Sequence, residues 1–337
     1  MGSHRRPASS GLGRSRGATA AVLSAAAAAA AFGTAPAHAA PRSPRASVDR
    51  LYQEAEQATE AYNQAGERAG SLRRRIGLAQ DRIARQQSRV NALRDTLGTL
   101  AGAQYRSGGI ASTLALLLSD DPAEYLDRAA TLDRIGARQA GRLRELQGAL
   151  RELVQERAVA AGEVAELERT RTAVVRHKRE VEHKLASAQR LLNSLPPGER
   201  AAYDRASRSG TDLPDLTGLV PPDSRAAAAL AAARSALGRP YVWGATGPGG
   251  FDCSGLMQWS YAHAGVGLPR TSQEQRFAGH RVPLSQARPG DIVVYRADAS
   301  HVAMYVGGGR VIHAPHPGAA VRYDPVGMLP IAAIVRP

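Results

Sequence analysis

The sequence predicts two regions of different fold class, an all-α coiled-coil hairpin followed by a small α+β domain. Two runs of residues at heptad spacing, one from Leu51 and one from Leu143, predict the hairpin. From Asp223 onward the composition becomes aromatic, Gly-rich and β-branched, which predicts strands packed with helices. The length of 337 residues leaves room for about two such domains.

Residues 1–39 are expected to be a signal peptide. Four arginines precede an Ala-rich apolar run from Ala18 to Ala37, and Ala37-His38-Ala39 has the small-x-small form of a cleavage site. We expect cleavage after Ala39. A membrane anchor is the alternative, but alanine contributes little transfer free energy and the run lacks the Leu, Ile and Phe content of a stable span.

The charge of the remaining chain favours an anionic envelope surface. Removal of the leader deletes four arginines and no acidic residue, which lowers the formal net charge from +14 to +10. Nucleic acid is the other common partner of basic proteins. Export argues against nucleic acid, and an aromatic content of 4% leaves few stacking platforms. We therefore expect a secreted, wall-associated protein, although a merely soluble basic surface fits the charge equally well.

The coiled coil is predicted over residues 46–195. The first seam alternates steps of four and three from Leu51 to Leu100, and the second runs from Leu143 to Leu195. Neither helix can bury its stripe alone, so we expect an antiparallel pair, with pairing between chains left open. Three cationic positions on the second seam weaken it, unless their stems pack while their charges reach solvent: Arg157, Arg171 and Lys178.

Short signals mark the ends of these helices. An apolar run, Ile110–Leu118, forms the predicted tip, and Asp121-Pro122-Ala123-Glu124 has the form of a helix start. Leu195-Pro196-Pro197-Gly198 ends the second helix, because proline lacks a donor and restricts its predecessor. We expect a linker over residues 196–222 and the α+β domain over residues 223–337, beginning with an Ala-rich helix.

Cys253 is the only cysteine, so an intramolecular disulfide is excluded. Glycines precede it and an amphipathic run from Leu256 to Ala262 follows it, which places the thiol at a helix start. There the helix dipole and the free amide groups are expected to lower the thiol pKa and to face an oxyanion. An inert core cysteine is the alternative, and the surrounding residues decide between the two.

A thiolate nucleophile needs an imidazole partner. Two predicted strands, 301–306 and 310–313, are joined by three glycines. With Val306 opposite Arg310, Ala303 faces His313 and His301 lies diagonally from it on the same face, about 7 to 8 Å away. This register predicts His301 as the base and His313 as the residue that orients its ring. A bulge at the glycines would break the register.

Two other interpretations of the histidines exist. Each histidine taken alone is interpreted as an ordinary strand residue, but two histidines on one face beside a helix-start cysteine favour catalysis. A metal site made of His301, His313 and His316 is disfavoured, because His316 follows Pro315 and no carboxylate stands at an obvious ligand spacing. We expect no metal and no cofactor.

Six motifs occur in order along about the last third of the chain: Tyr241-Val242-Trp243-Gly244, Phe251-Asp252-Cys253-Ser254-Gly255-Leu256, Leu268-Pro269-Arg270-Thr271-Ser272, Arg288-Pro289-Gly290-Asp291, His301-Val302-Ala303-Met304-Tyr305 and Ile312-His313-Ala314-Pro315. Together they resemble the NlpC/P60 family of papain-like peptidases. The resemblance implies a compact α+β papain-like fold. It also implies hydrolysis of peptidoglycan stem peptides at the bond between γ-D-glutamate and diaminopimelate or an equivalent diamino acid.

The matched positions make Cys253 the nucleophile, His301 the base and His313 the orienting third residue. The resemblance further implies that Tyr241 assists the oxyanion, and that Asp252 and Ser254 lie near the substrate peptide. A buried aromatic residue beside Trp243 is an equally good interpretation of Tyr241. The implied oxyanion and substrate-binding residues are Tyr241, Trp243, Asp252 and Ser254.

The front half is similar to coiled-coil segments that precede such domains in division-associated wall hydrolases of Gram-positive bacteria. In those relatives the coiled coil restrains the peptidase or docks on a membrane complex related to ABC transporters. The resemblance therefore places a docking site at Ile110–Leu118, a run that alternatively folds back on the hairpin. A non-catalytic scaffold or activator that binds the wall and acts through the coiled coil is the competing function.

Overall fold

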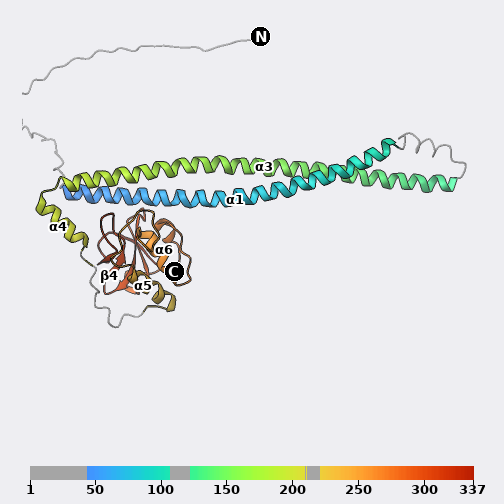
Figure 1. Cartoon of the computed structure of the whole chain (residues 1–337). Helices are drawn as coiled ribbons and strands as arrows, with labels where there is room; N and C mark the ends of the chain where they lie inside the picture. Colours follow the sequence, from blue (N-terminus) through green and yellow to red (C-terminus); the bar gives the residue numbers. More distant parts are fainter. Residues whose placement is uncertain (1–43, 107–121, 209, 211–220) are drawn as a thin grey trace, which may run out of the picture. The chain divides into compact units, whose positions relative to one another are not determined.

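The computed structural model of the chain describes residues 44–106, 122–208, 210 and 221–337 (Figure 1). Residues 42–337 form one compact unit that contains both the long helices and the C-terminal domain. The predicted signal peptide and the predicted tip Ile110–Leu118 lie outside the described residues. Among the helices that are described, none has the length and apolarity that crossing a membrane requires.

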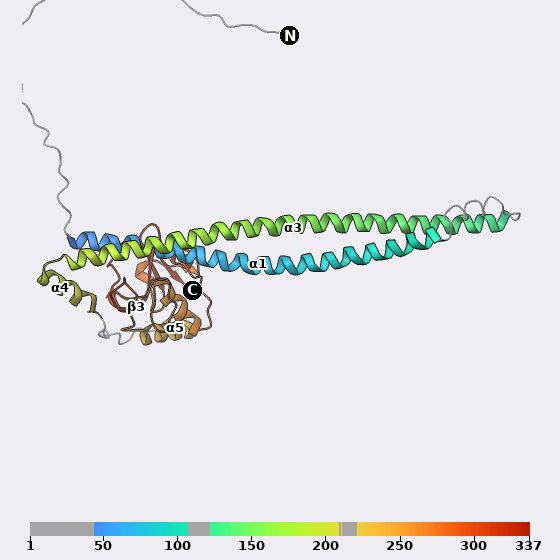
Figure 2. The ribbon, with the colours of Figure 1, turned by 45° about the horizontal axis from the view of Figure 1, so that its top comes forward.

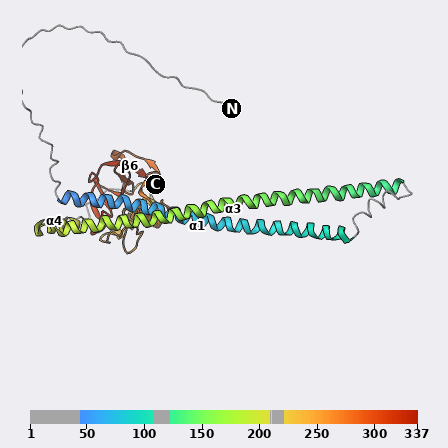
Figure 3. The same ribbon diagram turned by 90° about the horizontal axis from the view of Figure 1, so that it is seen from above.

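Two long helices, α1 (Pro44–Arg106) and α3 (Pro122–Asn193), run side by side in all three views (Figures 1 to 3). Ion pairs between them show that they are antiparallel, since arginines later in α1 pair with glutamates earlier in α3. The pairs follow a seven-residue step on α1: Arg68 with Glu166, Arg75 with Glu163, Arg82 with Glu156 and Arg89 with Glu145.

The predicted seam of α1 is largely buried, including Ala58, Leu72 and Val90. The predicted seam of α3 is wrong in its middle part. Val164 is 45% exposed, while Glu163 and Thr170 are buried in place of the predicted Val164 and Arg171. The helix faces its partner one residue earlier in the heptad here, so the predicted cationic positions are exposed, and Arg157 donates a hydrogen bond to Gln87 of α1.

Residues predicted as linker form a further helix, α4 (Pro197–Arg208). Tyr203 of α4 packs into a cluster with Val48 of α1 and with Leu192 and Leu195 at the end of α3. The proline pair therefore ends α3 as expected, but the chain turns into a short helix that packs against the hairpin.

The C-terminal domain combines helices with one antiparallel sheet of order β1-β6-β2-β3-β4-β5. Its helices α5 and α6 contact each other and strand β3, and they cover one face of the sheet. The predicted Ala-rich helix is present as α5, capped by Asp223, which accepts a hydrogen bond from the amide of Ala226. The elements are α5 (Ser224–Ser235), α6 (Cys253–His263), α7 (Ser272–Gln275), β1 (His280–Arg281), the 3-10 helix η1 (Leu284–Gln286), β2 (Ile292–Tyr295), β3 (His301–Gly307), β4 (Arg310–His313), β5 (Arg322–Pro325) and β6 (Ile331–Arg336).

The hairpin of β3 and β4 has the predicted register except at its turn. Met304 pairs with Ile312 and Tyr305 with Val311, which places Ala303 opposite His313 as expected. At the turn Gly307, not Val306, pairs with Arg310, because one extra residue bulges there. The three turn glycines all have positive φ (97°, 59° and 69°), a conformation that favours glycine. The bulge thus lies beyond the paired region that aligns the histidines.

Candidate active site

Cys253 is the first residue of α6, as the sequence predicts, and only 2% of its surface is exposed. Asp252 caps the helix by accepting a hydrogen bond of 2.7 Å from the amide of Gly255. A Cβ atom at position 255 would lie 2.2 Å from the carbonyl oxygen of Ala245. Glycine is therefore required for the close approach that fixes the start of this helix and, with it, the thiol.

His301 and His313 come together at the ends of two neighbouring strands. The Nε2 atom of His301 lies 2.8 Å from Nδ1 of His313, and the two rings are nearly perpendicular. Val302, directly after His301, packs in the same core cluster as Cys253, and its backbone amide favours the ionised thiol and so acts to lower the thiol pKa. The structure thus brings the predicted nucleophile, base and orienting residue into one buried group, which we call the catalytic set (Cys253, His301 and His313).

The carboxylate of Asp252 serves the fold around the thiol. Besides the amide of Gly255, it accepts a hydrogen bond of 2.9 Å from the amide of Gly244 and forms a buried ion pair with Arg270. Arg270 also donates to the hydroxyl of Ser254 at 2.9 Å. These contacts orient the residues on both sides of Cys253, and sequence inspection assigned no role to Arg270.

Two carboxylates from α1 enter the catalytic set. Glu60 accepts hydrogen bonds from the hydroxyl of Ser254 (2.7 Å) and the amide of Ser272 (2.8 Å), and it lies 3.8 Å from the sulfur of Cys253. Glu56 lies 3.1 Å from Nδ1 of His301, an ion-pair contact that lacks the alignment of a hydrogen bond. It also pairs with Arg296 at 2.5 Å. The helix hairpin therefore occupies the space through which a substrate would reach the thiol.

This arrangement reverses the predicted effect on the thiol. Burial, followed by the charges of Glu60, Asp252 and Glu56, raises the pKa of Cys253 well above its usual value. The helix start alone favours a thiolate, but a low-dielectric environment with three carboxylates disfavours a further negative charge. The prediction of a lowered pKa is wrong, because burial of the thiol and the three nearby carboxylates outweigh the effect of the helix start.

The two acids of α1 differ in their own ionisation. Burial and the neighbouring charge of Asp252 raise the pKa of Glu60 to about 7. Burial also raises the pKa of Glu56, but the charges of His301 and Arg296 outweigh it, so this pKa lies below its ordinary value. Glu56 is therefore stabilised in its ionised form here, whereas ionisation of Glu60 costs free energy.

The aromatic residues implied by the resemblance line the same region. Tyr241 is buried, and burial together with the nearby negative charge of Asp252 raises its pKa well above the ordinary value. Its phenol is therefore neutral and able to donate a hydrogen bond. Trp243 packs edge-to-face on Tyr62 of α1, with ring centroids 5.1 Å apart. The hairpin covers this side of the site as well.

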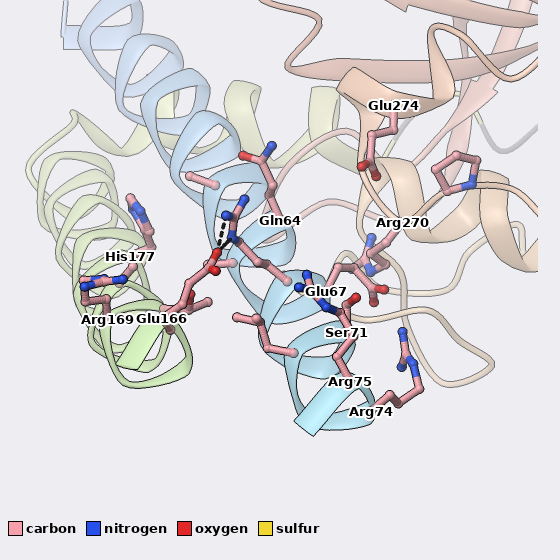
Figure 4. A pocket seen from close by; sticks show the side chains of 17 residues that line it. Gln64, Glu67, Ser71, Arg74, Arg75, Glu166, Arg169, His177, Arg270 and Glu274 are labelled. Atoms are coloured by element: carbon pink, nitrogen blue, oxygen red, sulfur yellow. Dashed lines mark hydrogen bonds and ion pairs between the residues drawn. The ribbon is translucent and has the colours of Figure 1, made fainter. Parts of the chain in front are cut away.

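A cavity of about 1090 Å³ lies beside the catalytic set, between α1, α3 and the segment around Arg270 (Figure 4). About half of its lining residues are charged. Glu166 of α3, which is labelled in Figure 4, forms an ion pair with Arg68 of α1. Neither Cys253 nor a catalytic histidine lines this cavity. Side chains of α1 fill the space directly over the thiol instead.

The third histidine of the disfavoured metal site lies elsewhere in the described part of the chain. His316 stacks on Tyr52 of α1, with ring centroids 4.6 Å apart, and its Nδ1 faces the carbonyl oxygen of Pro317. Within the residues described, no group of three or more His, Cys, Asp or Glu side chains is placed to hold a metal ion. The residues that sequence reasoning missed are those whose partners lie on another element or loop: Glu56, Glu60, Arg270 and Asp324.

The fold and the site together define the class of this C-terminal domain: a small α+β papain-like domain with a helix-start cysteine and a pair of sheet histidines. Residues 238–328 match the family model described as NlpC/P60 family. The C-terminal domain of the chain therefore belongs to the NlpC/P60 family.

Relatives of known sequence agree with this assignment. A protein of Corynebacterium glutamicum named "Probable endopeptidase" is 43% identical over 117 residues, which cover 35% of this chain and 56% of that protein. A "Probable endopeptidase" of Mycobacterium tuberculosis is 43% identical over 99 residues, covering 29% of this chain and 26% of the relative. The chain thus spans little more than half, or less, of these curated relatives.

Among solved structures, the NlpC/p60 domain of the peptidoglycan hydrolase SagA is 36% identical. The match covers 33% of this chain and 98% of that one, with a TM-score of 0.32.

Proposed function

We propose that the chain is a secreted peptidoglycan endopeptidase that uses Cys253 as its nucleophile. The observation that carries the proposal is the catalytic set itself, in which a buried thiol at a helix start is accompanied by two buried histidines whose ring nitrogens lie 2.8 Å apart. Membership of the NlpC/P60 family supports the same assignment. The proposed substrate is the stem peptide, cleaved between γ-D-glutamate and the diamino acid.

The chemistry follows from the arrangement of the rings. Nε2 of His301 is occupied by His313, so Nδ1 is the nitrogen available to take the thiol proton. The thiolate attacks the carbonyl carbon, and the tetrahedral oxyanion is stabilised by the amide groups at the start of α6 and by the phenol of Tyr241. The imidazolium then protonates the leaving amine. Water, deprotonated by the same imidazole, releases the acid from the acyl-enzyme and restores the thiol.

The contacts of Glu60 support a substrate that carries a carboxylate. Its carboxylate is held by the hydroxyl of Ser254 and the amide of Ser272, next to the thiol. A stem peptide cleaved on the γ side of D-glutamate presents a free α-carboxylate close to the scissile bond. When α1 is absent from the site, the same two donors are available for this group.

We further propose that the hairpin keeps the enzyme latent. With Glu60 beside the sulfur and Glu56 on Nδ1 of His301, both the nucleophile and the proton acceptor are blocked. Catalysis requires an open state in which α1 has left the catalytic set. We refer to the described arrangement as the closed state.

The test is digestion of purified cell wall by the full chain, by Cys253→Ala and by Glu56→Ala, with released muropeptides identified by mass spectrometry. We expect cleavage that depends on Cys253 and that increases in Glu56→Ala. If correctly folded Glu56→Ala releases no product in a Cys253-dependent way, the enzymatic proposal fails and a wall-binding scaffold becomes the better interpretation. A chelator that abolishes cleavage, while thiol alkylation does not, would identify metal chemistry instead.

Location and partners complete the proposal. An exported protein, cut after Ala39 and carrying a net charge of +10, suits an anionic wall. A membrane complex that binds Ile110–Leu118 would be a means of pulling α1 away. Cell fractionation, and crosslinking from that segment, test these two points.

A further inference from the structure

One carboxylate outside the predicted catalytic set contacts its third member. Asp324 lies on β5, the strand next to β4, and its Oδ2 atom is 2.8 Å from Nε2 of His313. The chain of contacts therefore runs from His301 through His313 to Asp324, with 2.8 Å at each step. Asp324 takes no part in the proposed catalytic steps.

The hydrogen-bonding capacities of these groups determine where the protons lie. A neutral imidazole has one donor and one acceptor nitrogen, and an ionised carboxylate only accepts. His313 must then carry its proton on Nε2 to donate to Asp324, which leaves Nδ1 as an acceptor. That acceptor in turn requires a donating Nε2–H on His301. In the open state the lone pair of neutral His301 is thereby placed on Nδ1, the nitrogen needed for the thiol proton.

The surroundings keep both groups in the required ionisation states. Burial lowers the pKa of His313 to about 4, so its ring is neutral near pH 7. Burial raises the pKa of Asp324, but the hydrogen bond from His313 and the charge of Arg322 outweigh this and lower it overall. Nε of Arg322 lies 2.8 Å from the same carboxylate oxygen.

Arg322 is itself fixed from two sides. Besides Asp324, its guanidinium donates to the carbonyl oxygens of Ala206 and Ser207 in α4, at 3.1 Å each. The oxygen of Asp324 that faces His313 therefore also contacts a counter-charge whose position is fixed. Such an outer partner fixes ring orientation and tautomer without touching the substrate.

We propose that Asp324, held by Arg322, is a positioning residue of this site that sets the tautomer of His313 and, through it, the tautomer of His301. The inference rests on the proposed function of the catalytic set. During attack the thiol proton moves to Nδ1 of His301, the resulting imidazolium donates through Nε2 to His313, and no proton passes to Asp324. Without the carboxylate, His313 is free to take the opposite tautomer, which donates to Nε2 of His301 and puts the ring proton on the thiol side.

The test uses the full chain with ¹⁵N-labelled histidine and with Glu56→Ala, which removes the carboxylate from Nδ1 of His301, and compares this chain with and without Asp324→Asn. An amide at position 324 is isosteric and can donate to Nε2, so we expect the His313 proton to move to Nδ1 in this variant. The ¹⁵N resonances distinguish protonated from unprotonated ring nitrogens, and His313→Gln assigns the signal. On a soluble stem peptide, kcat is expected to fall by about ten- to hundredfold with KM within threefold.

The neighbouring variant Tyr323→Phe is the control, because Tyr323 lies on the same strand and packs in the core. It is expected to change neither the tautomer nor kcat. If His313 keeps its Nε2 proton in Asp324→Asn, or if kcat is unchanged, the proposal is overturned. If the Glu56→Ala chain releases no product, the proposed function fails, and the His313 tautomer still decides whether Asp324 fixes the ring.

Discussion

Removal of one carboxylate from α1 is expected to open the site. Glu56 is 5% exposed and faces both Nδ1 of His301 and the guanidinium of Arg296. In Glu56→Ala the closed state buries these groups without a counter-charge, whereas in the open state water solvates them. Truncation of one partner of a buried ion pair costs about 2 to 4 kcal/mol. The population of the open state should therefore rise by about 30- to 700-fold.

The assay is the rate at which iodoacetamide alkylates Cys253 in the full chain under native conditions. The thiol is 2% exposed, so the reagent must wait for opening, and the rate follows the open population. In the open state position 56 has left the site, so the substitution does not alter the thiol that reacts.

The matched control is Glu54→Ala, which removes an ion pair with Lys184 inside the hairpin and leaves the contacts of Glu56 and Glu60 in place. We expect alkylation within about threefold of wild type for this exposed pair. Equal rates for Glu56→Ala and Glu54→Ala, with the helical content of both retained, would refute the reasoning that α1 closes the site through Glu56.

Two further predictions concern pH and the start of α6. Because the pKa of Glu60 rises from 4.5 to about 7, its contribution to closure is complete below 4.5 and is lost as the pH rises toward 7. The alkylation rate of wild type relative to Glu60→Gln should therefore rise by roughly ten- to hundredfold between pH 5 and pH 8; a constant ratio contradicts the assigned role of Glu60. Gly255→Ala places a Cβ atom 2.2 Å from the carbonyl oxygen of Ala245 and 2.8 Å from a carboxylate oxygen of Asp252, so it should lower the free energy of unfolding by about 1 to 3 kcal/mol or more. Gly249→Ala, which meets no atom within 4 Å, is the control in a thermal melt, and equal melting temperatures would exclude the clash.

The parts of the structure that follow from local chemistry were predictable from the sequence. Heptad spacing predicts the two long helices, because the period of the apolar stripe is a property of each helix alone. The position of Cys253 at a helix start follows from the glycines before it and the amphipathic run after it. The pairing of His301 with His313 required only the length of the loop between two short strands, and it survived a bulge located beyond them.

The closing face of α1 was not predictable in this way. Tyr52, Glu56, Glu60 and Asn63 are buried and lie one turn apart on a face beside the seam. Polar residues in such positions ordinarily mark a solvated face. The partners of Glu56 and Glu60 are about 190 to 245 residues away, at Cys253, Ser254, Arg296 and His301, and no periodicity within α1 records them. The signal within the sequence was a pair of acidic residues at i and i+4.

Asp324 was not predictable either, because its partner lies on a neighbouring strand. Arg322–Pro325 is a strand of four residues with two charged side chains and a terminal proline, features that argue against a strand when the segment is taken alone. Only pairing with β4 places Asp324 beside His313. Sequence patterns identify groups that act through their own element, whereas groups that act through a neighbouring element appear only in three dimensions.

The double use of His301 determines which substitution separates chemistry from closure. In the closed state His301 is an anchor for Glu56, and in the proposed reaction it is the base. His301→Ala therefore removes activity and also loosens the hairpin, so a loss of cleavage alone cannot be assigned to the chemical step. Cys253→Ala removes the nucleophile and leaves the contacts of Glu56 intact. If Cys253→Ala loses cleavage while its hairpin stays closed, the loss can be assigned to the missing thiol.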